Sequence, residues 1–217
     1  MISCNLNGAK RVLCLGAHSD DIEIGCGGTL LRMIEQSERI EFYWLVLCSN
    51  ATRAKEAMRS ANAFLNGARN RTVVVKSLRD GFLPYLGPPV KECFEELKKV
   101  FTPDVIFTHC RHDLHQDHRL VCELTWNTFR DHFILEYEIP KYDADLRSPN
   151  FFVPLSETQA RKKVKSLIRY FNTQQNKQWF SEELFYGLMR LRSTEAASPT
   201  HYSEAFYCRK ALLTTAN

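Results

Sequence analysis

The sequence has no long hydrophobic run. None of its 217 positions begins a stretch of 18 apolar residues, and the opening segment Met1–Lys10 holds no extended apolar region. A bilayer-spanning helix needs about 20 mostly apolar residues, and a secretory leader needs an apolar core of its own. We therefore expect neither a membrane span nor a secretion signal, which leaves a cytoplasmic location as the default.

The sequence also lacks the cysteine spacing of a disulfide framework. Its eight cysteines, at positions 4, 14, 26, 48, 93, 110, 122 and 208, include no C-x-x-C pair. Several fall inside expected strands or helices, which favours reduced and mostly buried thiols. Cys110 lies beside a histidine cluster, and for this residue the choice between a zinc ligand and a small buried side chain stays open.

Repeats and low-complexity linkers are absent, so we expect one domain over residues 1–217. Apolar runs predict strands that alternate with helices: strands at 11–17, 40–48, 72–77 and 104–109, and helices at about 26–36, 52–66, 89–100 and 118–132. This alternation predicts an α/β fold with a Rossmann-like, mostly parallel sheet and helices on both faces. Less regular strands (133–139, 151–153) and helices (156–171, 181–192) follow, and we expect the segment of about 133–206 to shape the substrate pocket.

The net charge of +4 is small, although Arg161–Arg169 concentrates positive residues. This run reads as a helix, because Val164, Leu167 and Ile168 form an apolar stripe opposite a solvated basic face. No nucleic-acid-binding motif accompanies it, so no nucleic acid partner is expected.

Glycines at 25, 27 and 28 enter an expected helix, but the sequence does not have the G-x-G-x-x-G spacing or the P-loop lysine of nucleotide sites. Two acidic residues, Asp20 and Asp21, also occupy the connection where a pyrophosphate would bind. We expect these glycines to let the helix pack closely instead.

Two clusters of imidazoles and carboxylates follow apolar runs. His18, Asp20 and Asp21 come directly after Val12–Leu15, and four of the seven histidines lie between His109 and His118, after Val105–Phe107. Parallel strands that end at one sheet edge bring such clusters together, and mixed histidine and aspartate ligands are typical of catalytic zinc. The sequence therefore predicts a metal site. His109 reads as a strand-end residue and His112 as a loop residue, and neither is assigned as a ligand.

The motifs resemble a known family. Ala17–Asp21 followed by Gly25–Leu30 is similar to the AHPDD…GGT signature of the PIG-L/LmbE-like N-acetylglucosaminyl deacetylases, and His115–His118 is similar to their HxDH motif. The resemblance extends from about Val12 to Phe206. Ser19 departs from the pattern by replacing the usual proline, which removes a constraint on φ in this turn.

The resemblance implies roles for individual residues. His18, Asp21 and His118 correspond to zinc ligands, Asp20 to the general base, and His115, oriented by Asp117, to the group that stabilises the oxyanion. Zinc is favoured by the resemblance, since two histidines and one aspartate also accommodate Fe²⁺.

Arg53 and Asp80 occupy two further positions where family members resemble this chain. They have suitable donors and acceptors for sugar hydroxyls, although an exposed arginine and a turn-forming Asp-Gly explain them equally well.

We therefore expect a zinc-dependent amidohydrolase that removes an N-acyl group, most simply acetyl, from an amino sugar or its conjugate. Two alternatives stay open: a non-catalytic glycan or nucleotide-sugar binding protein on the same fold, and a metal hydrolase that acts on another amide or ester. The sequence does not identify the sugar or the acyl group. It also leaves the oligomeric state open, and a homo-oligomer is one of the options.

Overall fold

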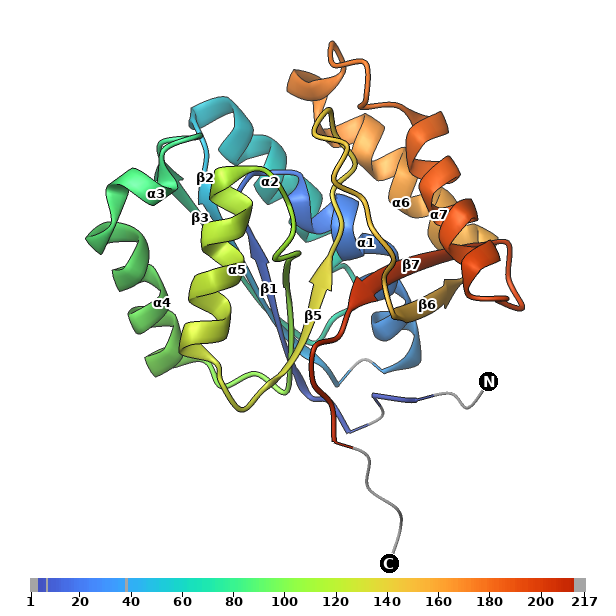
Figure 1. Ribbon diagram of the computed structural model, residues 1–217, viewed down its shortest axis with the longest axis horizontal. Coiled ribbons are helices and arrows are strands. Elements are labelled where there is room, and N and C mark those ends of the chain that lie inside the picture. Colours follow the sequence, from blue (N-terminus) through green and yellow to red (C-terminus); the bar gives the residue numbers. More distant parts are fainter. Residues whose placement is uncertain (1–3, 7, 38, 213–217) are drawn as a thin grey trace, which may run out of the picture.

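Figure 1 shows the computed structural model, in which strands from both halves of the chain form one mixed sheet. The structure describes residues 4–6, 8–37 and 39–212. Strands β1 to β5 are parallel, and β7 is antiparallel to β5 and β6. The order is β3-β2-β1-β4-β5-β7-β6, with β1 (Arg11–Gly16), β2 (Glu41–Cys48), β3 (Asn70–Leu78), β4 (Val105–His109), β5 (Phe133–Tyr137), β6 (Phe151–Leu155) and β7 (Tyr202–Tyr207).

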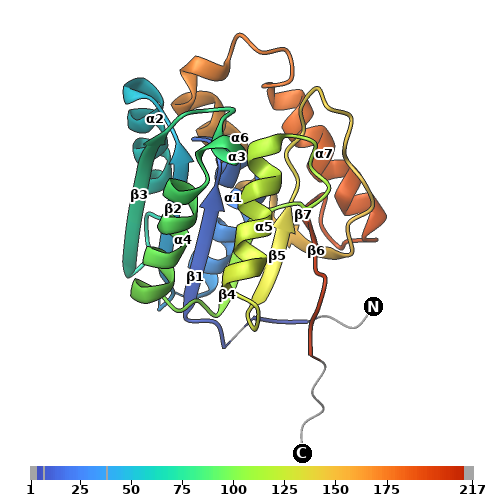
Figure 2. The ribbon, with the colours of Figure 1, turned by 60° about the vertical axis from the view of Figure 1, so that its left-hand side comes forward.

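Helices cover both faces of this sheet, as Figure 2 shows. One face carries α1 (Asp21–Gln36), α2 (Ala51–Phe64), α6 (Glu157–Tyr170) and α7 (Glu182–Glu195). The other carries α3 (Leu83–Leu86), α4 (Pro88–Val100) and α5 (Gln116–Thr128), while a short 3₁₀ helix, η1 (Asn172–Gln174), follows α6. The predicted α/β fold with a mostly parallel sheet is confirmed. Among the described residues, no helix has the length and apolar composition needed to cross a bilayer.

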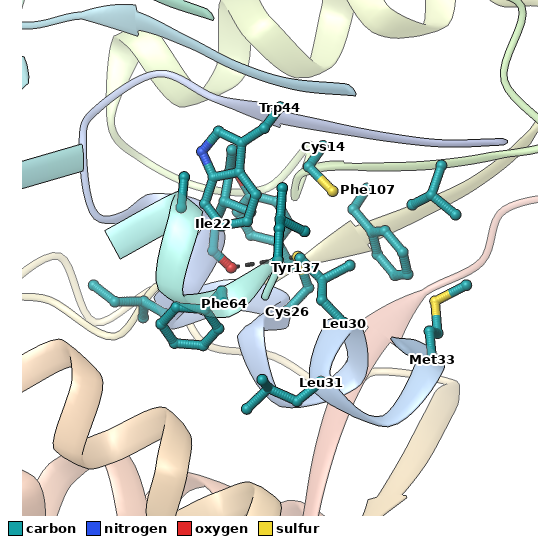
Figure 3. Close-up of a cluster of buried hydrophobic side chains, with 14 of the residues drawn as sticks. Cys14, Ile22, Cys26, Leu30, Leu31, Met33, Trp44, Phe64, Phe107 and Tyr137 are labelled. Carbon is teal, nitrogen blue, oxygen red and sulfur yellow. Dashed lines mark hydrogen bonds between the residues drawn. The ribbon is translucent and has the colours of Figure 1, made fainter. Parts of the chain in front are cut away.

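Two hydrophobic cores lie between the sheet and its helix layers. Successive β1 residues point to opposite faces, so Cys14 joins one core and Leu13 the other. Figure 3 shows the first core, where Cys14, Trp44 and Phe107 come from neighbouring strands and pack near Leu30 of α1. Each large side chain buried in this way contributes about 1.5–3 kcal/mol to stability. All eight cysteines are free and five are buried, in agreement with the sequence prediction.

Several elements differ from the sequence prediction. Helix α1 begins at Asp21, earlier than the expected start near 26, and α5 ends at Thr128, before the expected end near 132. Strand β7 is not predicted from the sequence, because Ser203 and Glu204 in its middle are polar although both are buried. Alternation of apolar and polar residues, the usual signal of a strand, is therefore hidden there.

Glycines bring α1 unusually close to its neighbours. A Cβ atom at Gly25 would lie 2.2 Å from the Tyr137 ring, and one at Gly28 would lie 2.4 Å from Leu155 Cδ1. Glycine in a helix interior is unfavourable by about 1 kcal/mol relative to alanine. The close packing explains why glycine is used here in spite of that penalty, and it confirms the expected role of these residues.

A buried ion pair connects α1, α6 and β7. The ammonium group of Lys163 donates to the Ile24 carbonyl and to Glu204 Oε1, both at 2.6 Å. Glu204 also accepts hydrogen bonds from the backbone N–H groups of Gly28, at 2.8 Å, and Thr29, at 2.6 Å. Buried charges are tolerated only with partners of this kind. Lys163 is thus an exception to the solvated basic face expected for Arg161–Arg169.

A glycine substitution tests the close packing of α1. We expect Gly25→Ala to lower the free energy of unfolding by about 1–3 kcal/mol, because the added methyl group displaces the Tyr137 ring. Gly187, which is exposed on α7 with no atom within 4 Å of an added Cβ, provides the control. Gly187→Ala should raise the free energy of unfolding by about 0.5–1 kcal/mol. Urea unfolding measures both, and equal stability of the two variants would contradict the packing account.

Candidate metal centre

The site lies where the parallel strands end, at the upper edge of the sheet in Figures 1 and 2. His18 and Asp20 belong to the connection from β1 to α1, and Asp21 is the first residue of that helix. The β4–α5 connection supplies His115, which caps α5, and His118 lies in the first turn of α5. β1 pairs directly with β4, so the two connections leave the sheet side by side.

The three predicted metal ligands converge. His18 Nδ1 lies 3.0 Å from His118 Nε2 and 3.4 Å from Asp21 Oδ2, and His118 Nε2 lies 3.6 Å from Asp21 Oδ1. Donors bound to zinc at 2.0–2.1 Å in a tetrahedron would be about 3.3–3.4 Å apart. The three distances are close to this value, with one Asp21 oxygen facing each histidine.

Further carboxylates hold the outer nitrogens of both imidazoles. His118 Nδ1 lies 2.8 Å from Asp113 Oδ2, and His18 Nε2 lies 3.0 Å from Asp80 Oδ1 and 3.2 Å from Asp117 Oδ2. A carboxylate on one ring nitrogen fixes the proton there and turns the lone pair of the other nitrogen inward. Two nitrogen lone pairs and the Asp21 carboxylate then face one another, an arrangement that is favourable only with a cation between them. The donor set fits a metal ion.

The electrostatics of the protein without metal agree with this interpretation. Burial alone would lower the pKa of His18, but the Asp21 carboxylate, with Asp117 and Asp80, holds it well above its usual value. Burial would raise the pKa of Asp21, but His118, His109 and His18 hold it well below its usual value. Without a metal, His18 therefore holds an extra proton that faces the Asp21 carboxylate. Metal binding at this position should displace that proton.

Asp20 lies beside the triad without joining it. Its Oδ1 accepts a hydrogen bond from Arg53 Nη2 at 2.6 Å, and the side chain is almost fully buried. Burial raises the pKa of Asp20 above its usual value, although the Arg53 guanidinium opposes the shift. The arginine reaches Asp20 from the first turn of α2, where the Asn50 side chain caps the helix at the backbone N–H groups of residues 52 and 53. A carboxylate with a raised pKa and one oxygen held is suited to accept a proton.

The predicted sugar-binding pair is also at the site. Arg53 Nη1 lies 3.7 Å from Asp80 Oδ2, so its guanidinium spans Asp20 and Asp80. The Asp80 side chain is 60% exposed and extends from the loop after β3 toward His18. Its contact with His18 lowers the pKa of Asp80 to about 2.

His115 and Asp117 are both near the triad but do not hydrogen-bond through their side chains. His115 Nδ1 accepts from the backbone N–H of Asp117 at 3.2 Å, which leaves the ring proton on Nε2. The Asp117 carboxylate instead contacts His18 and accepts from the backbone N–H groups of Gly81, at 2.7 Å, and Leu83, at 3.1 Å. Burial and the nearby His18 lower the pKa of His115, which favours a neutral ring. The expected orienting of His115 by Asp117 therefore comes from the Asp117 backbone in this structure.

The structure adds residues that the sequence analysis does not assign. Asp113 supports His118 and is itself held by Lys141, whose ammonium lies 3.0 Å from Asp113 Oδ1. His109, the last residue of β4, is fully buried, with Nε2 3.1 Å from Asp21 Oδ2. Within the described part of the chain, no group able to hold a metal contains Cys110 or His112. The three assigned ligands are divided between two such groups that share His118, one with His18 and His115 and the other with Asp21 and His109. Burial raises the pKa of the Cys110 thiol to about 12, which agrees with a buried side chain.

Solved structures with this fold come from proteins of different activity. The chain is 20% identical to the conserved protein TT1542 from Thermus thermophilus, with coverage of 94% of this chain and 96% of that one and a TM-score of 0.74. It is 22% identical to N,N'-diacetylchitobiose deacetylase from Pyrococcus horikoshii (92% and 84% covered, TM-score 0.68). It is 16% identical to GalB, the 4-carboxy-2-hydroxymuconate hydratase from Pseudomonas putida (96% and 99% covered, TM-score 0.74). At these identities the likeness shows the fold.

The family assignment comes from a match to the sequence itself. The model of the PIG-L family, described as GlcNAc-PI de-N-acetylase, matches residues 13–129, which is more than half of the chain. The matched segment contains every residue of the metal centre except the supporting Lys141. The resemblance seen in the two motifs is thus confirmed, and the chain belongs to the PIG-L family.

Proposed function

We propose that this protein is a zinc-dependent deacetylase that hydrolyses the N-acetyl group of an amino sugar or an amino-sugar conjugate. The observation that carries the proposal is a buried carboxylate, Asp20, beside a triad of His18, Asp21 and His118 that fits a metal ion. The family description and the fold of a chitobiose deacetylase support it. Zinc is the proposed metal, with Fe²⁺ as the alternative for the same donors.

Asp20 is the proposed general base. A bound metal ion of this kind lowers the pKa of water to about 7 and polarises a carbonyl group. Arg53 fixes one oxygen of Asp20, so the other can accept the proton that water loses as its oxygen attacks the amide carbon. The raised pKa of Asp20 brings its basicity closer to that task.

His115 is the proposed partner of the oxyanion. With Nδ1 engaged by the backbone, its neutral ring presents Nε2–H as a hydrogen-bond donor to the developing negative charge. Breaking the C–N bond then requires a proton for the leaving amine, and the proton taken up by Asp20 supplies it. The products are acetate and the free amino sugar.

Arg53 and Asp80 are the proposed contacts for sugar hydroxyls, since the exposed Asp80 carboxylate lies beside His18 and the Arg53 guanidinium is 3.7 Å from it. The segment of about 133–206 is the proposed remainder of the pocket. Two residues of this segment act on the metal centre. Lys141 contacts the Asp113 carboxylate, and the charge of Lys177 lowers the pKa of Asp20.

A binding protein without catalysis is the main alternative, and Asp20 argues against it. Glycan binding does not require a desolvated carboxylate next to a metal triad, and burial of such a group is unfavourable. A hydrolase for another amide or ester would use the same residues, so only a test of substrates can distinguish that function from deacetylation.

A screen of purified, zinc-loaded protein for acetate release from N-acetylglucosamine, its nucleotide conjugates and N-acetylated aminoglycosides tests the proposal. Absence of release from all of them, with carbamoyl, formyl or phosphate esters hydrolysed instead, would overturn it.

The two aspartates of the β1–α1 connection should separate catalysis from metal binding. We expect Asp20→Asn to lower kcat/KM by about 10²- to 10⁴-fold, because the proton acceptor is lost, with bound metal unchanged. His118→Ala, in contrast, should lose the metal itself. Elemental analysis and acetate release measure both quantities, and full activity of Asp20→Asn would refute the assigned role.

Asp113 allows a test of the support behind His118. We expect Asp113→Asn to weaken metal binding by about 10- to 100-fold, since the carboxylate no longer fixes the imidazole. Asp143→Asn is the matched control, because Asp143 carries the same charge near Lys141, at 3.6 Å, and is exposed. Competition with a chelator measures the affinity, and equal effects of the two variants would show that only general charge matters.

A further inference from the structure

A second cavity lies outside the metal centre, between α2 and the end of α6. Its volume is about 410 Å³, and it contains none of the residues assigned to the metal centre. Thr52, Lys55, Glu56 and Arg59 form the side contributed by α2. The opposite side consists of residues 169, 170, 172 and 173, at the junction of α6 and η1. Small-molecule sites commonly measure about 300–1,000 Å³, so the cavity has the size of a ligand site.

The lining of this cavity carries excess positive charge. Lys55, Arg59 and Arg169 are all exposed. None of the three forms an ion pair with any carboxylate in the part of the chain that the structure describes. Three cations and one carboxylate, Glu56, give the lining a formal charge of +2.

The single carboxylate of the lining is already engaged. Glu56 Oε1 accepts from the Thr173 backbone N–H at 3.0 Å, and Oε2 accepts from the Thr173 hydroxyl at 2.5 Å. Because both oxygens have donors, Glu56 is not a counter-ion for the arginines. It fixes η1 against α2 instead, and so holds the two sides of the cavity together. Glu56 as a whole is 8% exposed, as expected for a structural contact.

We propose that this cavity binds a phosphate monoester, separately from the metal centre. A phosphoryl group carries a charge of about −1.5 to −2 at pH 7, which matches the lining better than a single carboxylate does. Guanidinium groups such as Arg59 and Arg169 bind phosphoryl oxygens in a two-pronged geometry. The cavity is concave and all three cations line it, which favours a small ester over a nucleic acid or an anionic bilayer, since these engage extended surfaces.

Calorimetry with inorganic phosphate and glucose 6-phosphate tests the proposal, with glucose as the uncharged comparison. We expect saturable binding of the two phosphates and none of glucose. The double variant Arg59→Gln, Arg169→Gln should raise the Kd by about tenfold or more, since the charge-assisted hydrogen bonds of both guanidinium groups are lost. Lys55→Gln should weaken binding by a smaller factor, which gives a second measurement if the double variant folds poorly.

A matched control separates the cavity from general charge. Arg69→Gln with Lys99→Gln removes the same charge at two exposed positions outside the cavity. This control should leave the Kd unchanged. The proposal is overturned if phosphate does not bind, if the control weakens binding as much as the cavity variant, or if only DNA or vesicles with phosphatidylserine bind.

The phosphoryl group has two conceivable sources, either the amino-sugar substrate or a separate ligand. If glucose 6-phosphate competes with N-acetylglucosamine in the acetate-release assay, the phosphoryl group belongs to a substrate that extends from the cavity to the metal centre. Binding without competition indicates a separate ligand. This kinetic comparison rests on the proposed deacetylase activity, whereas the calorimetry does not, so failure of one is distinguishable from failure of the other.

Discussion

The parallel pairing of β1 with β4 is the constraint on which the metal centre depends. The register joins Val12 to Val105 and Cys14 to Phe107, so both strands end at the same edge although they are far apart in sequence. Short connections, residues 17–20 and 110–115, join β1 to α1 and β4 to α5. The donors therefore come from backbone segments that the sheet already holds in place. A change in this register would separate His18 from His118, whatever the chemistry of the two side chains.

The order of the elements was accessible from the sequence, because apolar runs and helical periodicity alternate clearly up to residue 128. The start of α1 was not, since three glycines in the first two turns oppose helix formation locally. Contacts with Tyr137 and Leu155, far along the chain, decide that segment. The same holds for β7, where Glu204 is buried because Lys163 and the backbone of α1 satisfy it. Long-range partners of this kind leave no local pattern.

The candidate site could be predicted in part, for a related reason. Motif spacing brings together His18, Asp21 and His118, and in the structure each pair of these side chains approaches within 3.6 Å, with both Asp21 oxygens taking part. The carboxylate of Asp113 looks like an ordinary loop residue in the sequence, because its role depends on the orientation of one imidazole. The side chain of Asp117 contacts His18 in the structure, whereas the motif alone suggests a partnership with His115. Side-chain direction, unlike residue type, is set by packing.

The antiparallel pair of β6 and β7 joins the parallel strands through two residue pairs between β7 and β5, Glu136 with Tyr207 and Tyr137 with Phe206. Glu204 adds a second attachment, to the backbone of α1. Tyr137 ties the pairing of β5 with β7 to the metal centre, because its hydroxyl lies 3.3 Å from His109 Nε2. The loops between β5 and α7 can change in length and sequence where they carry no supporting residue such as Lys141, which holds Asp113. We expect evolution of specificity within this architecture to proceed by remodelling that region, with the metal-binding half inherited as a unit.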